Sequence, residues 1–297
     1  MNVEDHPHSQ VFFDLHNDDV ISMAWSQDRT EMFTGEMGAK PTIFRWDKEG
    51  NELKRYKGVK KGVSAVAVNQ NYLVASGLDD NHYIYVFDIE KGSLVASEKG
   101  GREVILGLAW VSGSSFASVG PKHFKSWEFA GGKVKGKTGS FGKHCNLLCS
   151  VEVKEGKVFT GASNGEVLVW GGNSVAKAEK GHSGAVNALC IHEDILLSGS
   201  NDESIKIWNA DSLKLLFTVD VKFRLEGSVS KKIRALDVMD KRILVGTFGS
   251  EIYQLESSLP IKDTTADVKV RVFSKNMSGH YSPNYVTNEV WGLGFID

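Results

Sequence analysis

One short pattern recurs along the chain: an apolar, strand-like run that ends in an aromatic residue. Its fullest copy covers residues 198–209, Ser-Gly-Ser-Asn-Asp-Glu-Ser-Ile-Lys-Ile-Trp-Asn. The aromatic residue recurs at intervals of 38 to 43 residues, at Trp46, Phe87, Trp127, Trp170 and Trp208. Alignment gives a degenerate sixth copy at Leu255. Units of this length are too short to bury a core alone, so they must stack on their neighbours.

Each unit contains four strand-like runs separated by turns rich in Gly, Asn, Asp and Ser. In the fifth unit they follow the dipeptide Gly181-His182 and cover residues 185–191, 195–199, 204–208 and 214–219. Short apolar runs bounded by such turns are typical of antiparallel strands. A Gly-His…Trp-Asp signature repeated about every 40 to 45 residues predicts an all-β protein, a WD-repeat β-propeller.

The two ends of the chain are predicted to complete this propeller together. We expect residues 1–10 to be a flexible tail and residues 11–297 to be the propeller. Residues 11–15 have strand character and residues 289–296 resemble an inner strand, but no middle strands separate them. Because an open propeller would leave sheet edges in water, we expect six complete four-stranded blades and a partial seventh built from both termini. We also expect the chain to be a fragment or short relative of a larger two-propeller protein.

Four residues of the fifth unit fit a hydrogen-bonded chain inside the blade: His182, Ser198, Asp202 and Trp208. An imidazole held by an aspartate can bond to a hydroxyl that also meets the indole N–H, which satisfies groups that would otherwise be buried unpaired. Only this unit is predicted to have all four, since the second keeps Asp80 without a preceding Gly-His. A His-Ser-Asp set also suggests a hydrolase triad, but its place in a repeat favours a structural role.

Two other features of the sequence bear on cofactor chemistry, a glycine-rich and lysine-rich segment and the three cysteines. Residues 131–138, Gly-Gly-Lys-Val-Lys-Gly-Lys-Thr, match the phosphate-binding pattern GxxxxGK[ST]. That chemistry needs a helix after the loop, whereas residues 139–142 are unsuited to begin one, so we interpret the match as a coincidence in a turn between third and fourth strands. The three cysteines, Cys145, Cys149 and Cys190, lack the paired spacing of zinc ligands. We therefore expect no cofactor, no metal site and no enzymatic activity.

The same segment is basic, because residues 129–151 include no acid and four lysines, Lys133, Lys135, Lys137 and Lys143. Such a patch can attract an acidic partner, although lysines beside an edge strand also keep it from pairing with another chain. We take these four lysines as candidate partner-binding residues. Five further candidates lie in the inner-strand entry and turns of other units: His16, Lys40, Asn81, Lys122 and Asn201.

Composition limits the class of partner. The net charge is −2, which argues against bulk nucleic-acid binding, and no aromatic residues interleave with the lysines as single-strand binding requires. No apolar run approaches the roughly 18 residues of a membrane span, and no signal peptide is recognisable. We expect a cytoplasmic protein-interaction domain that binds neither nucleic acid nor membrane.

Several stretches resemble the echinoderm microtubule-associated protein-like family. Residues 78–88 resemble its Asp-Asp-x-x-His-x-x-x-Val-Trp-Asp segment, and residues 118–127 its Gly-Lys-x-His…Trp strand. Residues 140–143 are similar to its Phe-Gly-Lys signature and residues 35–46 to its first-blade crossover. Residues 279–293 are similar to its Gly-His…Glu-Leu-Trp-Gly-Leu.

The resemblance runs in order over roughly residues 16–296 and corresponds to the first of that family's two propellers. It implies a non-catalytic scaffold of the cytoskeleton, binding tubulin or a microtubule-associated partner through propeller loops. The family's coiled coil, hydrophobic motif and second propeller are not among these residues, and no family motif marks tubulin-contacting side chains. The alternative is a WD-repeat scaffold of an unrelated multiprotein complex, since fold does not fix function.

Overall fold

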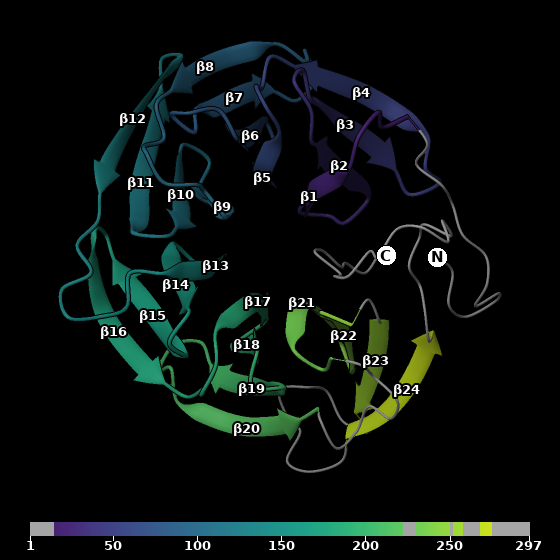
Figure 1. The fold of residues 1–297 in the computed structure, drawn as a ribbon, viewed down its shortest axis with the longest axis vertical. Coiled ribbons are helices and arrows are strands. Elements are labelled where there is room, and N and C mark those ends of the chain that lie inside the picture. The colour runs from purple at the N-terminus through teal and green to yellow at the C-terminus, as the bar shows by residue number, and fades with distance from the viewer. Residues whose placement is uncertain (1–14, 222–229, 250–251, 258–267, 275–297) are drawn as a thin grey trace. The chain divides into compact units, whose positions relative to one another are not determined.

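The computed structural model describes residues 15–221, 230–249, 252–257 and 268–274. The regular elements of these residues are all β-strands, numbered β1 to β24 (Figure 1). No described segment forms a helix long and apolar enough to cross a membrane. The strands group in chain order into six four-stranded sheets, each with its strands in sequential order.

The described residues fall into two compact units, and the first holds three complete sheets and most of a fourth. Its first sheet contains β1 (Val20–Trp25), β2 (Glu31–Glu36), β3 (Thr42–Asp47) and β4 (Glu52–Lys57). The second contains β5 (Val63–Val68), β6 (Tyr72–Gly77), β7 (Ile84–Asp88) and β8 (Leu94–Glu98). The third contains β9 (Gly107–Ser112), β10 (Ser115–Gly120), β11 (His123–Ala130) and β12 (Lys133–Thr138). The fourth contains β13 (Leu148–Lys154), β14 (Lys157–Ala162), β15 (Glu166–Gly171) and β16 (Ser174–Lys180).

The other unit holds residues 161–167 and 179–180 of the fourth sheet and the two sheets that follow it. The fifth sheet contains β17 (Val186–His192), β18 (Ile195–Ser200), β19 (Ser204–Asn209) and β20 (Leu215–Asp220). The sixth contains β21 (Ile233–Met239), β22 (Arg242–Thr247), β23 (Ile252–Ser257) and β24 (Val268–Ser274). The six complete four-stranded blades predicted from the repeat are thus confirmed. The predicted tail and, apart from Leu15, the segments of the partial seventh blade lie outside the described residues.

The sequence repeat is also a repeat of strand register. In five sheets the residue at the aromatic position of the third strand lies opposite the second residue of the second strand. The pairs are Trp46 with Met32, Phe87 with Leu73, Trp127 with Phe116, Trp208 with Leu196, and Leu255 with Ile243. Because side chains alternate between faces along a strand, a constant register sends the same set of side chains to the same face in every blade.

The apolar core lies between consecutive sheets of the same unit. Phe33 and Tyr56 of the first sheet pack with Val66 and Phe87 of the second, in one buried cluster. A second cluster joins the second and third sheets, and a third joins the fifth and sixth. The blades that share these clusters therefore bury facing sides against one another, which leaves their turns and outermost strands as surfaces open to partners.

Candidate functional site

The four residues singled out in the fifth blade form one continuous hydrogen-bonded chain. The Trp208 indole N–H donates to Ser198 Oγ at 2.8 Å, and Ser198 Oγ lies 2.8 Å from His182 Nε2. His182 Nδ1 lies 3.0 Å from an oxygen of Asp202. Since the carboxylate can only accept, Nδ1 carries the proton, and Nε2 accepts from the serine hydroxyl. Every donor from the indole to the carboxylate is satisfied.

This order of Asp, His and Ser is also that of a hydrolase triad, but the serine here has no access to a substrate. Ser198 is 0% exposed, and its oxygen already accepts from the indole. A nucleophile must reach a reacting carbon with its oxygen free to attack. This series of hydrogen bonds therefore stabilises the blade, and its serine does not act as a nucleophile.

Burial alone would raise the pKa of Asp202, but hydrogen bonds outweigh it. The carboxylate accepts from His182, from the Ser204 hydroxyl at 2.7 Å and from the Ser183 amide at 3.0 Å. Together with the charge interaction with His182, these bonds hold the pKa of Asp202 well below its usual range. The aspartate stays ionised and keeps the imidazole oriented.

The glycine of the Gly-His dipeptide is explained by the indole beside it. A Cβ added to Gly181 would lie 2.3 Å from Cη2 of Trp208, closer than any side chain tolerates. The neighbouring turn imposes a second limit, because Gly165 has a φ of +89° and an added Cβ would lie 2.0 Å from the His182 carbonyl oxygen. Both glycines allow backbone to approach the buried chain closely.

The first blade contains an equivalent series of hydrogen bonds that no sequence motif indicated. The Trp46 indole donates to Thr34 Oγ1 at 2.7 Å, and Thr34 Oγ1 lies 2.8 Å from His16 Nε2. His16 Nδ1 lies 2.9 Å from Glu36 Oε2. The expectation that only the fifth blade has all four members is wrong, because here a glutamate replaces the aspartate and no glycine precedes the histidine.

The same geometry corrects the role suggested for His16. Its side chain is 5% exposed, and both ring nitrogens bond within the blade. The Glu36 carboxylate also accepts from the backbone N–H groups of Asn17 and Thr42. The imidazole is therefore occupied inside the first blade and is not available to a partner.

Two further blades carry shorter versions of the chain. In the third, the Trp127 indole donates to Ser118 Oγ at 2.8 Å, which lies 2.7 Å from Nε2 of His123. Burial lowers the pKa of His123 to about 4, and the charges of Lys125 and His82 act in the same direction. In the fourth, Trp170 donates to Thr160 at 3.0 Å.

A hydroxyl is present wherever the third strand supplies an indole. In the first, third and fifth blades, one residue of the second strand lies opposite the aromatic residue of the third strand. The hydroxyl residue comes two positions after it in the sequence, and it is Thr34 in the first blade, Ser118 in the third and Ser198 in the fifth. The second and sixth blades have Phe87 and Leu255 instead of tryptophan, and Ala75 and Val245 at the hydroxyl position. Donor and acceptor are gained or lost together, as the cost of an unpaired buried polar group requires.

The acid of the second blade is Asp79 rather than Asp80. Asp79 is buried and accepts from the amide of Asn81 at 3.1 Å and, at a longer 3.4 Å, from the Tyr85 hydroxyl. Asp80 has an 85% exposed side chain and pairs with Lys61. The predicted position, Asp80, is thus one residue too late, because two aspartates are adjacent and the first of them is the buried one.

The basic segment is a strand and not a turn, contrary to expectation. Lys133, Lys135 and Lys137 lie in β12, the outermost strand of the third sheet, and only Gly131 and Gly132 form the turn before it. The three lysines alternate with Val134, which is buried, and with Gly136. They therefore share one face of an edge strand, where all three are exposed.

Gly136 has a structural role that accounts for the second glycine of the GxxxxGK[ST] pattern at residues 131–138. It lies opposite Trp127, and an added Cβ would lie 2.5 Å from Cζ3 of the indole. The glycine is thus required by ring packing, and the strand continues through Thr138 with no helix after it. The residues cannot cradle a phosphate on a helix N-terminus.

The remaining candidates lie in connections between strands. Lys143 is exposed in the connection from β12 to β13, and Lys40, Asn81 and Lys122 are exposed between the second and third strands of their blades. Asn201 occupies the corresponding turn of the fifth blade, but it is half-buried and its Oδ1 accepts from Asn187 Nδ2 at 2.7 Å. The structure thus places the lysines and Asn81 at the surface. The Asn201 side chain is half-buried and hydrogen-bonded to Asn187, so it is less accessible to a partner.

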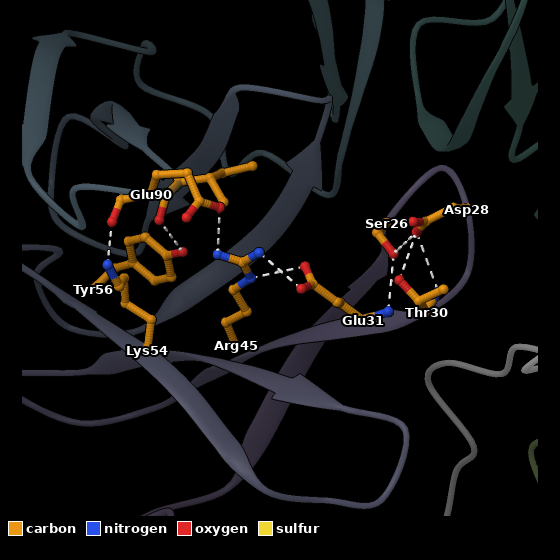
Figure 2. A network of polar contacts seen from close by, with 9 residues as sticks. Ser26, Asp28, Thr30, Glu31, Arg45, Lys54, Tyr56 and Glu90 are labelled. Atoms are coloured by element: carbon orange, nitrogen blue, oxygen red, sulfur yellow. Dashed lines mark hydrogen bonds and ion pairs between the residues drawn. The ribbon is translucent and has the colours of Figure 1, made fainter.

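A polar network that the sequence did not indicate joins the first two blades (Figure 2). The Arg45 guanidinium donates to both oxygens of Glu31, at 2.7 and 2.8 Å, and to Glu90 at 2.9 Å. The hydrogen bonds with Glu31 raise the pKa of Arg45 above its usual range. The Tyr56 hydroxyl donates to the Ile89 carbonyl at 2.9 Å, and Lys54 donates to that of Glu90. Three side chains of the first blade, those of Arg45, Lys54 and Tyr56, therefore hold the turn after β7 against that blade.

Two adjoining hollows lie beside this network. One, of about 300 Å³, is lined by residues of the β1–β2 turn together with Arg45 and Glu90. The other, of about 260 Å³, shares Gln27, Asn69 and Gln70 with it. Neither is lined by histidine, cysteine or lysine, so neither offers an imidazole, thiol or amine for catalysis. Within the described residues no cluster of His, Cys, Asp and Glu could hold a metal ion.

Comparison with known proteins decides the family. Residues 9–255 match the profile of the echinoderm microtubule-associated protein first β-propeller. The chain belongs to this family. Its members are non-enzymatic propeller scaffolds, which agrees with the buried serine of the fifth blade. The resemblance deduced from the sequence is confirmed.

The relatives that match are considerably longer than this chain. The ciliary WD repeat-containing protein ctxp80 of Euplotoides octocarinatus is 29% identical over 294 residues, which cover 95% of this chain and 38% of that protein. The 77 kDa echinoderm microtubule-associated protein of Strongylocentrotus purpuratus is 28% identical over 71% of this chain and 34% of its own length. The mouse echinoderm microtubule-associated protein-like 2 is 28% identical over 67% and 35%. The chain thus spans little more than a third of these relatives.

Solved structures establish the fold. The β-propeller domain of Myceliophteria thermophila Cps50 (Swd1) superposes with a TM-score of 0.68 at 12% identity, over 82% of this chain and 84% of that domain. The WD40 β-propeller domain of Doa1 superposes with a TM-score of 0.64 at 17% identity, over 80% and 78%. This member of the echinoderm microtubule-associated protein family therefore has the WD-repeat β-propeller fold.

Proposed function

We propose that this chain is a non-catalytic scaffold of the microtubule cytoskeleton that binds tubulin or a microtubule-associated protein. Its family membership supports this, as do relatives whose names describe them as microtubule-associated proteins. The proposal places the chain in the cytoplasm, associated with the cytoskeleton. It assigns no binding to nucleic acid or membrane.

The observation that carries the proposal is the basic face of β12. Lys133, Lys135 and Lys137 project from one face of an exposed edge strand, and Lys143 follows in the next connection. No hydrogen bond or ion pair joins these four ammonium groups to another described residue. Unpaired lysines on a rigid sheet form a positive surface that attracts an acidic partner, and tubulin is strongly acidic. Charges at the rim of an interface act mainly on association rate and salt sensitivity.

Co-sedimentation with polymerised tubulin tests the proposal. The wild-type chain should pellet with microtubules, and the quadruple variant Lys133→Glu, Lys135→Glu, Lys137→Glu, Lys143→Glu should pellet several-fold less. A charge-matched control reverses four exposed lysines elsewhere: Lys48, Lys99, Lys180 and Lys214. Because net charge changes equally in both variants, a loss confined to the first locates the contact on β12 and its following connection.

Other outcomes have definite meanings. Equal weakening in both quadruple variants would reduce the effect to net charge and remove the basic face from the proposal. Unaltered binding in the first variant would move the contact to the turns at Lys40, Asn81 and Lys122. Absence of any binding by the wild-type chain would contradict direct microtubule association and favour a scaffold for another complex.

A further inference from the structure

A groove crosses the turns that follow the inner strands of the first three blades. It consists of the two adjoining hollows beside the Arg45 network, of about 300 and about 260 Å³, and Gln27, Asn69 and Gln70 line both of them. The first hollow lies beside the β1–β2 turn, and the second reaches residues 110–113 of the third blade. All of these residues belong to one compact unit. Each volume is close to the lower end of the range for ligand pockets, about 300 Å³, so the groove can hold part of a partner molecule.

The walls of the groove are held in place by hydrogen bonds. Oδ1 of Asp28 accepts from the hydroxyls of Ser26 at 2.6 Å and Thr30 at 2.9 Å, which fixes the β1–β2 turn (Figure 2). Asn69 Nδ2 donates at 3.4 Å to the carbonyl of Gly113, which links the turns of the second and third blades. A site that is already formed loses less conformational entropy on binding than one that must first be ordered.

The first hollow carries a net negative charge. Three carboxylates, those of Asp28, Glu31 and Glu90, line it together with one guanidinium, that of Arg45. Arg45 donates to both oxygens of Glu31 but only to Oε1 of Glu90. Within the described residues, no group donates to Glu90 Oε2 or to Asp28 Oδ2. This hollow therefore favours a cation, and a guanidinium best, because its N–H groups match carboxylate oxygens in pairs.

Side-chain amides line the rest of the groove. Gln27 and Gln70 are exposed and hydrogen-bond to no other described residue. Each amide offers two N–H donors and a carbonyl acceptor, which are the groups that pair with the backbone of an extended peptide. Trp110 lies in the second hollow, and its indole N–H already donates to the Ala67 carbonyl at 3.2 Å, so it offers its ring surface.

We propose that this groove binds an extended, basic peptide segment of a second protein partner. An arginine side chain of that segment lies in the first hollow beside Asp28 and Glu90, and its backbone pairs with the amides of Gln27 and Gln70. This site goes beyond the proposed microtubule scaffold, because the basic face of β12 attracts an acidic partner whereas the groove attracts a basic one. A scaffold with both surfaces can hold two segments of opposite charge.

NMR titration of the full ¹⁵N-labelled chain tests the proposal, with two acetylated heptapeptide amides as probes. One has the sequence Ala-Ser-Ala-Arg-Ala-Ser-Ala, and the other has glutamate in place of arginine. The arginine peptide should shift the side-chain signals of Gln27, Gln70 and Trp110, with a dissociation constant of about 1 mM or below. These signals are assigned by their loss in Gln27→Met, Gln70→Met and Trp110→Phe. The glutamate peptide should bind about ten-fold more weakly or worse, because it lacks the charge-assisted hydrogen bonds.

Matched variants locate the contact. The double variant Asp28→Asn, Glu90→Gln removes both charges and keeps the side-chain shapes, so it should weaken the arginine peptide about ten-fold or more. Glu49→Gln is the control, since Glu49 is exposed in the β3–β4 turn and lines neither hollow, and its affinity should equal that of the wild type. If the double variant does not fold, shown by lost dispersion of its spectrum, the comparison of the two peptides on the wild-type chain decides.

Two results would overturn the proposal: equal affinities for the arginine and glutamate peptides, or unshifted signals of Gln27, Gln70 and Trp110. N-acetylarginine amide is a third probe, and binding as tight as that of the arginine peptide would overturn the part assigned to the peptide backbone. No tubulin is present in this titration, so its result is independent of microtubule co-sedimentation.

Discussion

Nδ1 of His182 lies 3.0 Å from Oδ2 of Asp202 inside the fifth blade. The proton on Nδ1 fixes the donor and acceptor roles in every hydrogen bond from this pair to Trp208. Because His182 Nδ1 donates to the carboxylate, Nε2 is left to accept from Ser198, whose oxygen accepts from the indole. The first blade repeats this order with His16 and Glu36. Each of these two series of hydrogen bonds places buried polar groups inside a blade that is otherwise packed with apolar side chains.

The variant His182→Ala should lower the free energy of unfolding by about 1 to 3 kcal/mol, because Asp202 and Ser198 each lose a partner in a buried site. The change is measured by chemical denaturation with circular dichroism. An unaltered denaturation midpoint would show that the buried chain does not stabilise the blade.

His123 should make stability depend on pH. Its pKa is lowered to about 4 in the folded protein from an ordinary value of 6.5, so the unfolded state binds more protons between these limits. Stability should therefore be full above about pH 6.5 and fall as pH drops toward 4, by up to about 3 kcal/mol. His123→Gln should flatten this dependence in denaturation curves recorded across the range. Equal slopes for the variant and the wild type would contradict a buried neutral imidazole.

The variant Gly136→Ala should destabilise the third blade, because its Cβ would lie 2.5 Å from the Trp127 ring. Displacing a packed indole costs about 1 to 3 kcal/mol. Gly113→Ala is the control, since nothing lies within 4 Å of its added Cβ. Thermal unfolding should show a lower melting temperature for Gly136→Ala alone. Equal melting temperatures for the two variants would mean that the glycine serves some other purpose.

The variant Arg45→Met should weaken the contact between the first two blades, because it removes the paired hydrogen bonds to Glu31 and the bond to Glu90. A partly buried charged network of this kind contributes about 1 to 2 kcal/mol. Lys91→Met, which removes an exposed contact with Asp88 at 3.4 Å, should change the denaturation midpoint little. If the two variants behaved alike, the network of Figure 2 would be only a surface feature.

The blades could be predicted from the sequence because the aromatic residue of the third strand has a constant register. That register places Trp46 and Trp208 against the second residue of the preceding strand. The buried chain of the fifth blade was also predictable, since a Gly-His pair and a turn aspartate precede Trp208. The sequence contains one more useful pattern. In the first, third and fifth blades, a threonine or serine follows by two positions the second-strand residue that lies opposite the tryptophan.

Other features depended on contacts that spacing does not show. Glu36 replaces the aspartate of the first blade from the end of a strand rather than from a turn, so its link to His16 carries no local pattern. Lys133 to Lys137 read as a turn because glycine and lysine are poor strand formers, yet burial of Val134 and the fit of Gly136 against Trp127 hold them in β12. Tertiary packing outweighed local preference there.

The salt dependence of microtubule affinity tests the central claim most directly. The dissociation constant for polymerised tubulin is measured by co-sedimentation over a series of potassium chloride concentrations, for the wild-type chain and for the Lys133, Lys135, Lys137 and Lys143 charge-reversed variant. If the basic face of β12 contacts an acidic partner, wild-type affinity should fall steeply with salt, and the variant should bind more weakly with a flatter dependence. Identical affinities and identical slopes for the two proteins would contradict the account.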